Sequence, residues 1–271
     1  MGYLLRRDGN IMANELLRMR IARMVHHAGE GHIPSSFSIL EILHSLYKHV
    51  LDVRPDTLSS PDRDIFVLSK GHGAAAHYVV LHEFGFLEEK DLDHYSRPGG
   101  ILGGHADSTA VPGVEFSTGS LGHGLPMAAG AALGKKIARQ GGRVYVLIGD
   151  GESHEGTTWE AAQVARNLEL DNLTVLVDLN DSALQLMPVD DALAKWEAFG
   201  WDAVEIEGHD EQAIAKSATN HRKDGRPKAI VARTNKGHGV GFMTGHGAWH
   251  HKVPSELELE QISLELGVLD L

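Results

Sequence analysis

Two short polar motifs carry the oxygen ligands that a magnesium diphosphate needs. They are Gly149-Asp150-Gly151 and Asp178-Leu179-Asn180. Magnesium prefers oxygen ligands in octahedral geometry, and it usually takes one or two carboxylates from the protein and the rest from phosphates, carbonyls and water. The side-chain oxygens of Asp150 and Asn180, with the backbone carbonyl of Ser182 just beyond, would supply the protein's share. The sequence therefore predicts a site for a diphosphate and a divalent cation, which is Mg²⁺ or a substitute such as Ca²⁺ or Mn²⁺.

The elements around these motifs would bring them to one place. Apolar runs over residues 143–148 and 173–177 are typical of buried parallel strands, and the helix-length stretch 156–170 between them completes a β-α-β unit. Ligands of open α/β sheets bind at the carboxyl ends of the strands, which is where both motifs lie. Gly149 and Gly151 leave space in which the backbone can turn and approach a phosphate closely. We therefore expect one binding site at this edge of a parallel sheet.

Other segments indicate how the rest of the chain is built. Helices are predicted over residues 11–28, 124–139 and 255–271, and strands over residues 203–206 and 228–232. Ser38 and Glu41 have the spacing of a capping box, which predicts that a further helix begins there. The alternation of helices and strands predicts an α/β fold: a doubly wound, mostly parallel sheet flanked by helices.

Composition agrees with one large α/β domain that spans residues 1–271. The chain of 271 residues is 42% hydrophobic and 23% charged, so it can bury a sizeable core. It has no cysteine and no signal-peptide pattern opens it, so a cytoplasmic protein is expected. No apolar stretch approaches the roughly 20 residues that cross a bilayer. We therefore expect no membrane as partner. A net charge of −12 disfavours binding to phosphate backbones, so we expect no nucleic acid as partner either.

The two polar motifs belong to a longer series that resembles the thiamine-diphosphate signature of transketolases. The central matches are the segment 149–156, Trp159-Glu160-Ala161-Ala162 and Leu170-Asp171-Asn172-Leu173. Upstream and downstream matches are the segments 31–32, 62–73, 103–105, 112–124, 195–201, 207–210, 234–240 and 249–250. Their order and approximate spacing agree from about Glu15 to Pro254, which is nearly the whole chain.

The resemblance implies an activity and a partner. A single-chain transketolase is more than twice as long, because it also has a domain that receives the aminopyrimidine ring of the cofactor and a third, C-terminal domain. This chain therefore resembles the N-terminal, diphosphate-binding subunit of a split transketolase, whose partner subunit supplies the pyrimidine domain. The resemblance implies thiamine diphosphate as cofactor and transfer of a two-carbon ketol unit from a ketose or its phosphate to an aldose or its phosphate. We expect two copies of each subunit in the assembly and no activity from this chain alone.

The resemblance also assigns residues to the cofactor. Those expected to contact it are His72, Gly119, Leu121, Gly149, Asp150, Gly151, Glu155, Asp178 and Asn180. Asp178 is expected near the thiazolium ring. Glu155 is expected to link paired active sites, although a carboxylate at that place would equally stabilise a helix N-terminus.

Histidine is unusually frequent, with 18 residues in the chain. Four of these lie beside a glycine or in a matched motif, and the resemblance implies that they line the substrate channel and act in catalysis: His32, His72, His105 and His250. An unperturbed histidine titrates near neutral pH, so it can move protons on and off sugar hydroxyls.

Clustered histidines also suggest a zinc site as an alternative. His246 and His250 are one helical turn apart, and His26, His27 and His32 lie close together in sequence. Glycines on both sides of His246 disfavour the helix that such a pair needs, and no cysteine is available as a further ligand. A hydrogen-bonding role is therefore the stronger hypothesis for these side chains.

The chain departs from the transketolase pattern near the expected site. His123 replaces the glutamine of a Gly-Gln-Gly triplet, and the familiar Gly-His-Pro-Gly is Gly31-His32-Ile33-Pro34. The loop after Asn180 is shorter than usual, which bears on Ser182 as a ligand. These changes leave room for an atypical sugar substrate.

Two other classes of function remain open. One is a subunit of a different thiamine-diphosphate enzyme, either the α subunit of a 2-oxoacid dehydrogenase or a protein similar to deoxyxylulose phosphate synthase. The other is a noncatalytic scaffold that kept the fold but lost turnover. The Gly-His motifs and Trp249-His250 favour ketol transfer over the first, and intact Asp150 and Asn180 speak against the second.

Overall fold

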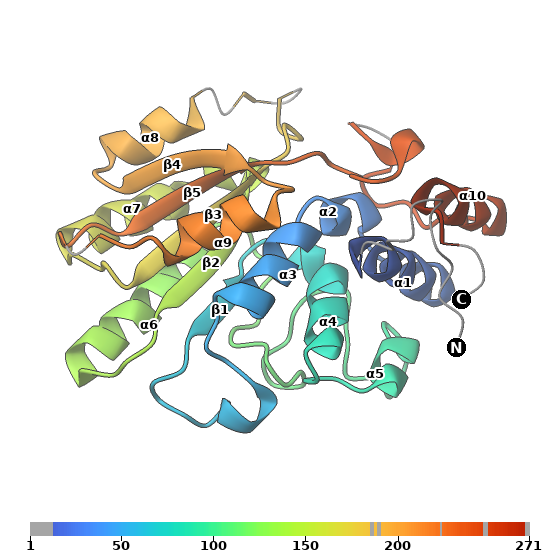
Figure 1. The fold of residues 1–271 in the computed structure, drawn as a ribbon, viewed down its shortest axis with the longest axis horizontal. Coiled ribbons are helices and arrows are strands. Elements are labelled where there is room, and N and C mark those ends of the chain that lie inside the picture. The colour runs from blue at the N-terminus through green and yellow to red at the C-terminus, as the bar shows by residue number, and fades with distance from the viewer. Residues whose placement is uncertain (1–12, 185–186, 189–190, 223, 246–248, 269–271) are drawn as a thin grey trace.

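A parallel sheet forms the centre of the molecule (Figure 1). The computed structural model describes residues 13–184, 187–188, 191–222, 224–245 and 249–268. In this part of the chain the strands are β1 (Ile65–Leu68), β2 (Val144–Gly149), β3 (Leu173–Leu179), β4 (Asp202–Glu207) and β5 (Lys228–Arg233). They form one sheet in the order β1-β2-β3-β5-β4, and every neighbouring pair is parallel.

Helices cover both faces of this sheet. They are α1 (Ala13–Ala28), α2 (Ile33–Phe37), α3 (Leu40–His49), α4 (Ala74–Glu83), α5 (Glu89–Asp93), α6 (Gly124–Ala138), α7 (Gly156–Asn167), α8 (Ala192–Ala198), α9 (Glu211–Thr219) and α10 (Glu256–Leu266). Successive strand residues point to opposite faces, so Val146 and Val175 pack with α6, α7 and α8. Leu147 and Leu176 belong to a second core, which includes α1 to α4, α9 and α10. The predicted doubly wound α/β fold is confirmed.

The central strands were predictable because they are buried on both faces. Every residue of β2 and β3 is buried, which is why their sequences read as continuous apolar runs. The predicted strands over residues 203–206 and 228–232 correspond to β4 and β5. The strand β1 was not predicted, since a run of four apolar residues does not distinguish a strand from a buried helix.

Three predicted helices are present with shifted ends. Residues 13–28 of the predicted helix 11–28 form α1, and residues 11–12 lie outside the described part of the chain. The helix α6 ends at Ala138 because Arg139 adopts a left-handed conformation, with a φ of 55°. The helix α10 begins after a capping box between Ser255 and Glu258 and ends before Gly267. None of the described helices has the length and apolar character needed to cross a bilayer.

The predicted capping box at Ser38 and Glu41 is wrong. The helix α2 directly precedes this segment, so the backbone N–H of Ser38 is already bonded to the carbonyl of Pro34. The next helix, α3, has Ile39 at its N-cap and no side-chain cap. The hydroxyl of Ser38 instead donates to Asp178 at 2.9 Å, and Glu41 accepts from Arg18. Both polar side chains are buried together with these partners.

Candidate functional site

Four adjacent strands deliver polar residues to the same edge of the sheet. Lys70 follows β1, Asp150 follows β2, Asn180 follows β3 and Thr234 follows β5. The register explains this convergence, since Gly149 pairs with Asp178 and Asp178 pairs with Ala232. The carboxyl ends of parallel strands therefore meet where open α/β sheets bind their ligands.

Asp150 is a buried carboxylate with no cationic side chain within ion-pair distance in the described part of the chain. It is 3% exposed. Its Oδ1 accepts hydrogen bonds from the N–H of Gly151 at 2.7 Å and the hydroxyl of Ser182 at 2.9 Å, and its Oδ2 accepts from the N–H of Ala183 at 3.1 Å. An ionised carboxylate away from water is costly unless a cation lies beside it. The chemistry of this side chain therefore fits a metal ligand.

Asn180 presents its oxygen to the same place. Its Nδ2 donates to Oδ2 of Asp178 at 2.8 Å, so the amide can face only one way. Its Oδ1 accepts from the N–H of Ser182 at 3.0 Å and keeps a second lone pair. Ser182 thus bonds to Asn180 through its N–H and to Asp150 through its hydroxyl, so the three residues lie together. The carbonyl of Ser182 as a metal ligand stays a prediction.

Asp178 organises the residues behind this pair. It is fully buried, and its Oδ2 accepts from Lys70 Nζ at 2.5 Å, from the hydroxyl of Ser38 at 2.9 Å and from Asn180. Its Oδ1 accepts from the hydroxyl of Thr234. These donors engage the carboxylate fully, so its clearest task is to neutralise Lys70 and orient Asn180. Its contact with a thiazolium ring stays a prediction.

Lys236 was not singled out from the sequence, yet it is a buried cation in the same site. It is 7% exposed, and its ammonium group donates to Nδ1 of His250 at 2.8 Å. No carboxylate among the described residues lies within ion-pair distance of it. Burial, followed by the charge of Lys70, lowers its pKa, while Asp150 and Asp178 oppose that shift. Its position shortly after β5 could have indicated Lys236 from the sequence, because the other residues of the site also follow the ends of strands.

The four predicted histidines come together around His32. The centroid of the His32 ring lies 5.4 Å from that of His72, 6.2 Å from that of His105 and 5.6 Å from that of His250. His251, which was not predicted, is closer still at 4.5 Å. These side chains come from segments far apart in sequence, and Lys236 is hydrogen-bonded to one of them, His250.

Burial keeps the two inner histidines of this cluster neutral. It lowers the pKa of His32 from 6.5 to about 4, and His251 and His250 act in the same direction. It lowers the pKa of His72 to about 2, with Lys70 as the next contribution. A neutral imidazole has one donor and one acceptor nitrogen, so each ring can exchange hydrogen bonds with a sugar hydroxyl.

The segment with Gly119 and Leu121 borders the cluster. Gly119 has a φ of 151°, and a Cβ there would lie 3.0 Å from Cδ2 of His105. A Cβ on Gly71 would lie 2.8 Å from the backbone nitrogen of Gly119, so the two backbones touch. Leu121 is half-buried, and its carbonyl accepts from Nδ1 of His123 at 3.0 Å. Only glycine fits where these segments meet.

Two neighbouring glutamates hold this segment in different ways. Glu152 was not predicted; it is buried and accepts from the hydroxyl of Ser69, from the N–H of Gly122 at 2.8 Å and from the N–H of Gly149 at 3.2 Å. It therefore ties the loop before α6 to the ends of β1 and β2. Glu155 is exposed at the N-cap of α7 and adjoins Gly122. Its place agrees with the stabilisation of a helix N-terminus, and its link between active sites stays a prediction.

Comparison with known proteins identifies the family. Residues 10–269 match the family model described as transketolase, thiamine diphosphate binding domain. The chain belongs to this family. It is 41% identical over 244 residues to an apulose-4-phosphate transketolase subunit of Actinobacillus succinogenes, and the match covers 87% of this chain and 88% of that protein. It is 38% identical over 229 residues to the 6-deoxy-6-sulfo-D-fructose transketolase subunit SqwG of a Clostridium species, covering 82% and 83% of the two chains.

Solved transketolases share the fold but are much longer. The transketolase of Campylobacter jejuni aligns with a TM-score of 0.86 and 28% sequence identity, over 94% of this chain and 42% of that one. This transketolase-family chain thus spans less than half of that protein, but most of the length of the two subunits named above. The predicted kinship with N-terminal transketolase subunits is confirmed, and so is the assignment to a thiamine-diphosphate-binding domain.

The zinc alternative finds no support in the described part of this transketolase-family domain. His246 lies outside the described residues. Nδ1 of His26 is hydrogen-bonded to the carbonyl of Pro254 at 2.7 Å, while His32 and His250 belong to the cluster around the site. No described group of three close metal-ligating side chains contains these histidines.

The neutral state of the inner histidines gives a spectroscopic prediction. The ring-proton resonances of His32 and His72 are expected to move little between about pH 5 and pH 8, because both groups gain a proton only at lower pH. The measurement is a two-dimensional NMR titration in which His32→Gln and His72→Gln identify the two signals. A midpoint near pH 6.5 for either signal would contradict the burial described for that ring.

Proposed function

We propose that this chain is the diphosphate-binding subunit of a two-subunit transketolase, which transfers a two-carbon ketol unit from a ketose to an aldose. The observation that supports this most is the arrangement at the sheet edge, where Asp150 is a buried acid and Lys236 is a buried cation of the same site. Neither has an oppositely charged side chain within ion-pair distance among the described residues. A diphosphate with a divalent cation would complement both groups at once. The named relatives are subunits of transketolases, which supports the same activity.

The residues of the site divide the binding of the cofactor between them. Asp150, Asn180 and the backbone of Ser182 would hold Mg²⁺, and Lys236 would bind diphosphate oxygens. When bound, thiamine diphosphate supplies the electron sink for breaking a carbon–carbon bond. The Gly119 backbone approaches His105 closely, so the loop through Leu121 would form the wall between cofactor and histidines.

The histidine cluster would handle the sugar. His32 and His72 are neutral, so each can accept a hydrogen bond from one hydroxyl and donate one to another. The ammonium group of Lys236 occupies Nδ1 of His250 and thereby leaves the proton of that ring on Nε2. The exposed rings of His105 and His251 would complete the substrate side of the site.

The proposal includes a partner. The related proteins of Actinobacillus and Clostridium are named as subunits, and this chain spans most of their length. We therefore place the pyrimidine-binding part of the enzyme on a second polypeptide, with two copies of each in the assembly. The names of the two relatives specify a phosphorylated and a sulfonated sugar, and either class of substrate is compatible with the proposed site.

Complementation tests this function directly. The purified chain alone should show no ketol transfer, and turnover should appear when a second polypeptide with the pyrimidine-binding domain is added together with thiamine diphosphate and Mg²⁺. The assay measures aldose released from a panel of phosphorylated, sulfonated and plain ketoses. Full activity without the second polypeptide would contradict the division of the enzyme between two chains.

Two further measurements separate the alternatives. Calorimetry with thiamine diphosphate and Mg²⁺ on the reconstituted complex should show saturable binding, whereas a noncatalytic scaffold that lost the site would give no heat. Product analysis with a 2-oxoacid in place of a ketose should show no decarboxylation. Carbon dioxide release from the 2-oxoacid would point to another thiamine-diphosphate reaction.

A further inference from the structure

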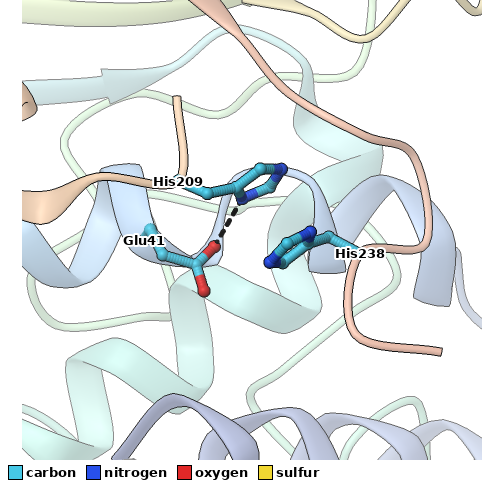
Figure 2. Close-up of side chains that lie close together, drawn as sticks. All are labelled: Glu41, His209 and His238. Carbon is cyan, nitrogen blue, oxygen red and sulfur yellow. Dashed lines mark hydrogen bonds and ion pairs between the residues drawn. The ribbon is translucent and has the colours of Figure 1, made fainter. Parts of the chain in front are cut away.

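A second cluster of polar side chains lies outside the proposed cofactor site. It consists of Glu41 from α3, His209 after β4 and His238 after β5 (Figure 2). One potential ligand atom from each residue lies within 4.8 Å of the others, so a metal site is the first hypothesis to test. Two histidines with one carboxylate form a known type of transition-metal site.

The hydrogen bonds of His209 argue against a metal. Its Nδ1 is 3.0 Å from Oε2 of Glu41, and its Nε2 accepts the backbone N–H of Asn235 at 2.9 Å. A backbone N–H can only donate, so Nε2 carries no proton and Nδ1 must carry the proton of the neutral ring. A metal on Nδ1 would displace that proton to Nε2, where it would face the N–H of Asn235.

The geometry of the two rings also disfavours a shared ion. The rings of His209 and His238 are stacked, with centroids 3.5 Å apart and planes inclined by 11°. The lone pairs of stacked imidazoles run parallel to each other in separate planes, whereas metal ligands must point toward one centre. In addition, the cation Arg18 already binds Oε1 of Glu41 at 2.5 Å. The cluster therefore has a different task.

The same contacts form a directed chain of hydrogen bonds. Arg18 donates to Glu41, Nδ1–H of His209 donates to the other oxygen of Glu41, and Asn235 donates to Nε2 of His209. Arg18 and Glu41 are both almost fully buried, at 4% and 5% side-chain exposure. Each of these residues has one hydrogen-bonding arrangement that satisfies its neighbours, so this series of hydrogen bonds holds the Asn235 peptide in one position.

That peptide belongs to the segment that carries Lys236. Further bonds fix the neighbouring peptides: the N–H of Gly237 donates to the carbonyl of Pro34 at 3.0 Å, and Nε of Arg18 donates to the carbonyl of His238 at 2.9 Å. Arg18 thus reaches the segment twice, once directly and once through Glu41 and His209. These contacts fix the backbone on both sides of Lys236 and thereby set the direction of its ammonium group.

We propose that His209 is a positioning residue: held by Glu41 and Arg18, it fixes the Asn235 peptide and thereby places Lys236 for the diphosphate. This inference rests on the proposed function, since it assumes that Lys236 binds the cofactor. The described hydrogen bonds and ring contact of His209 are with Glu41, Asn235 and His238, none of which is proposed to bind the cofactor or the sugar. Its effect on binding must therefore pass through Lys236.

Two substitutions at His209 separate positioning from simple packing. His209→Gln places an amide oxygen where Nε2 stood, so it can still accept from Asn235, whereas His209→Asn places its amide near Nδ1 and leaves the N–H of Asn235 without an acceptor. We expect His209→Asn to raise the Kd of the reconstituted complex for thiamine diphosphate about tenfold, and His209→Gln to raise it less than about threefold. Equal losses for both variants would overturn the proposal.

A double-mutant cycle shows whether the effect passes through Lys236. In a Lys236→Ala background, His209→Asn is expected to change the Kd by less than about twofold, because there is no longer an ammonium group to place. If the two losses multiply instead, His209 acts independently of Lys236 and the proposal fails. Should His209→Asn not fold, Glu41→Gln is the second variant, since it removes the charge that holds Arg18 and His209, and the same non-additivity is expected.

A matched control variant and the wild-type complex distinguish failure of the positioning role from failure of the proposed function. His221→Gln alters another half-buried histidine, whose ring contacts Tyr145 and not the Lys236 segment, and it should leave the Kd unchanged. Absence of thiamine-diphosphate binding by the wild-type complex would refute the proposed function. Normal wild-type binding together with equal Kd values for wild type and His209→Asn would refute the positioning role alone.

Discussion

Replacing Asp150 by alanine is expected to weaken the binding of thiamine diphosphate to the reconstituted complex at least about 100-fold, or by about 2.7 kcal/mol. The side chain is the one carboxylate of the proposed cation site, and it is buried with no cation beside it among the described residues. Its loss would remove the charged ligand proposed for Mg²⁺, and it removes the acceptor that fixes Ser182. Calorimetry at several Mg²⁺ concentrations measures the effect, and kcat/KM for ketol transfer should fall by at least the same factor.

The control for this experiment is a carboxylate of the same type outside the site. Asp93 is exposed on α5, and Asp93→Ala should leave both the Kd and its Mg²⁺ dependence unchanged. Melting temperatures without cofactor show whether the two variants are equally folded. If Asp150→Ala bound the cofactor with unchanged Mg²⁺ dependence, the cation would have to lie elsewhere.

Replacing Asp178 by alanine is expected to lower the free energy of unfolding by about 3–5 kcal/mol, the range observed when one partner of a buried ion pair is removed. Asp178 is fully buried, so the change leaves Lys70 as an uncompensated charge at 2% side-chain exposure. It also deprives Ser38, Asn180 and Thr234 of an acceptor. Urea unfolding followed by circular dichroism gives the free energy, with the denaturant slope as a check on compactness.

An exposed ion pair provides the comparison. Asp56 lies 3.4 Å from Arg54, and the two side chains are 78% and 62% exposed, so Asp56→Ala should cost no more than about 1 kcal/mol. A similarly small loss for Asp178→Ala would mean that water or a local rearrangement compensates Lys70. The account of Asp178 as the centre of the site would then be wrong.

The sequence predicted those parts of the fold whose signals are local. The strands β2 and β3 are buried along their whole length, so their sequences are apolar runs that predict strands. The polar motifs that follow these runs predicted where the strands end and hence which edge of the sheet carries the site. The nearness of Asp150 and Asn180 followed from parallel topology, because neighbouring parallel strands end together. The gathering of four histidines around one place was expected only from the family resemblance.

The remaining parts of the site depend on contacts between distant segments. Ser38 and Glu41 have the spacing of a helix cap, but Asp178 and Arg18 engage them instead, and no local pattern encodes that competition. Lys236 and His209 likewise gain their significance from which charges and peptides surround them. From the sequence alone, a lysine after a strand end does not indicate a binding site. It does so only once the structure shows that no acid among the described residues lies within ion-pair distance of it.

The fixed amide of Asn180 has a consequence for how fast the metal can be taken up. Because Asp178 holds the amide nitrogen, the oxygen that would meet the ion already faces the site in the free protein. Metal binding then requires little rearrangement of the protein. The rate-limiting step is the loss of hydration water from Mg²⁺, which dehydrates reluctantly. Ions of the same charge that lose water more readily, such as Ca²⁺, should enter this site faster than Mg²⁺.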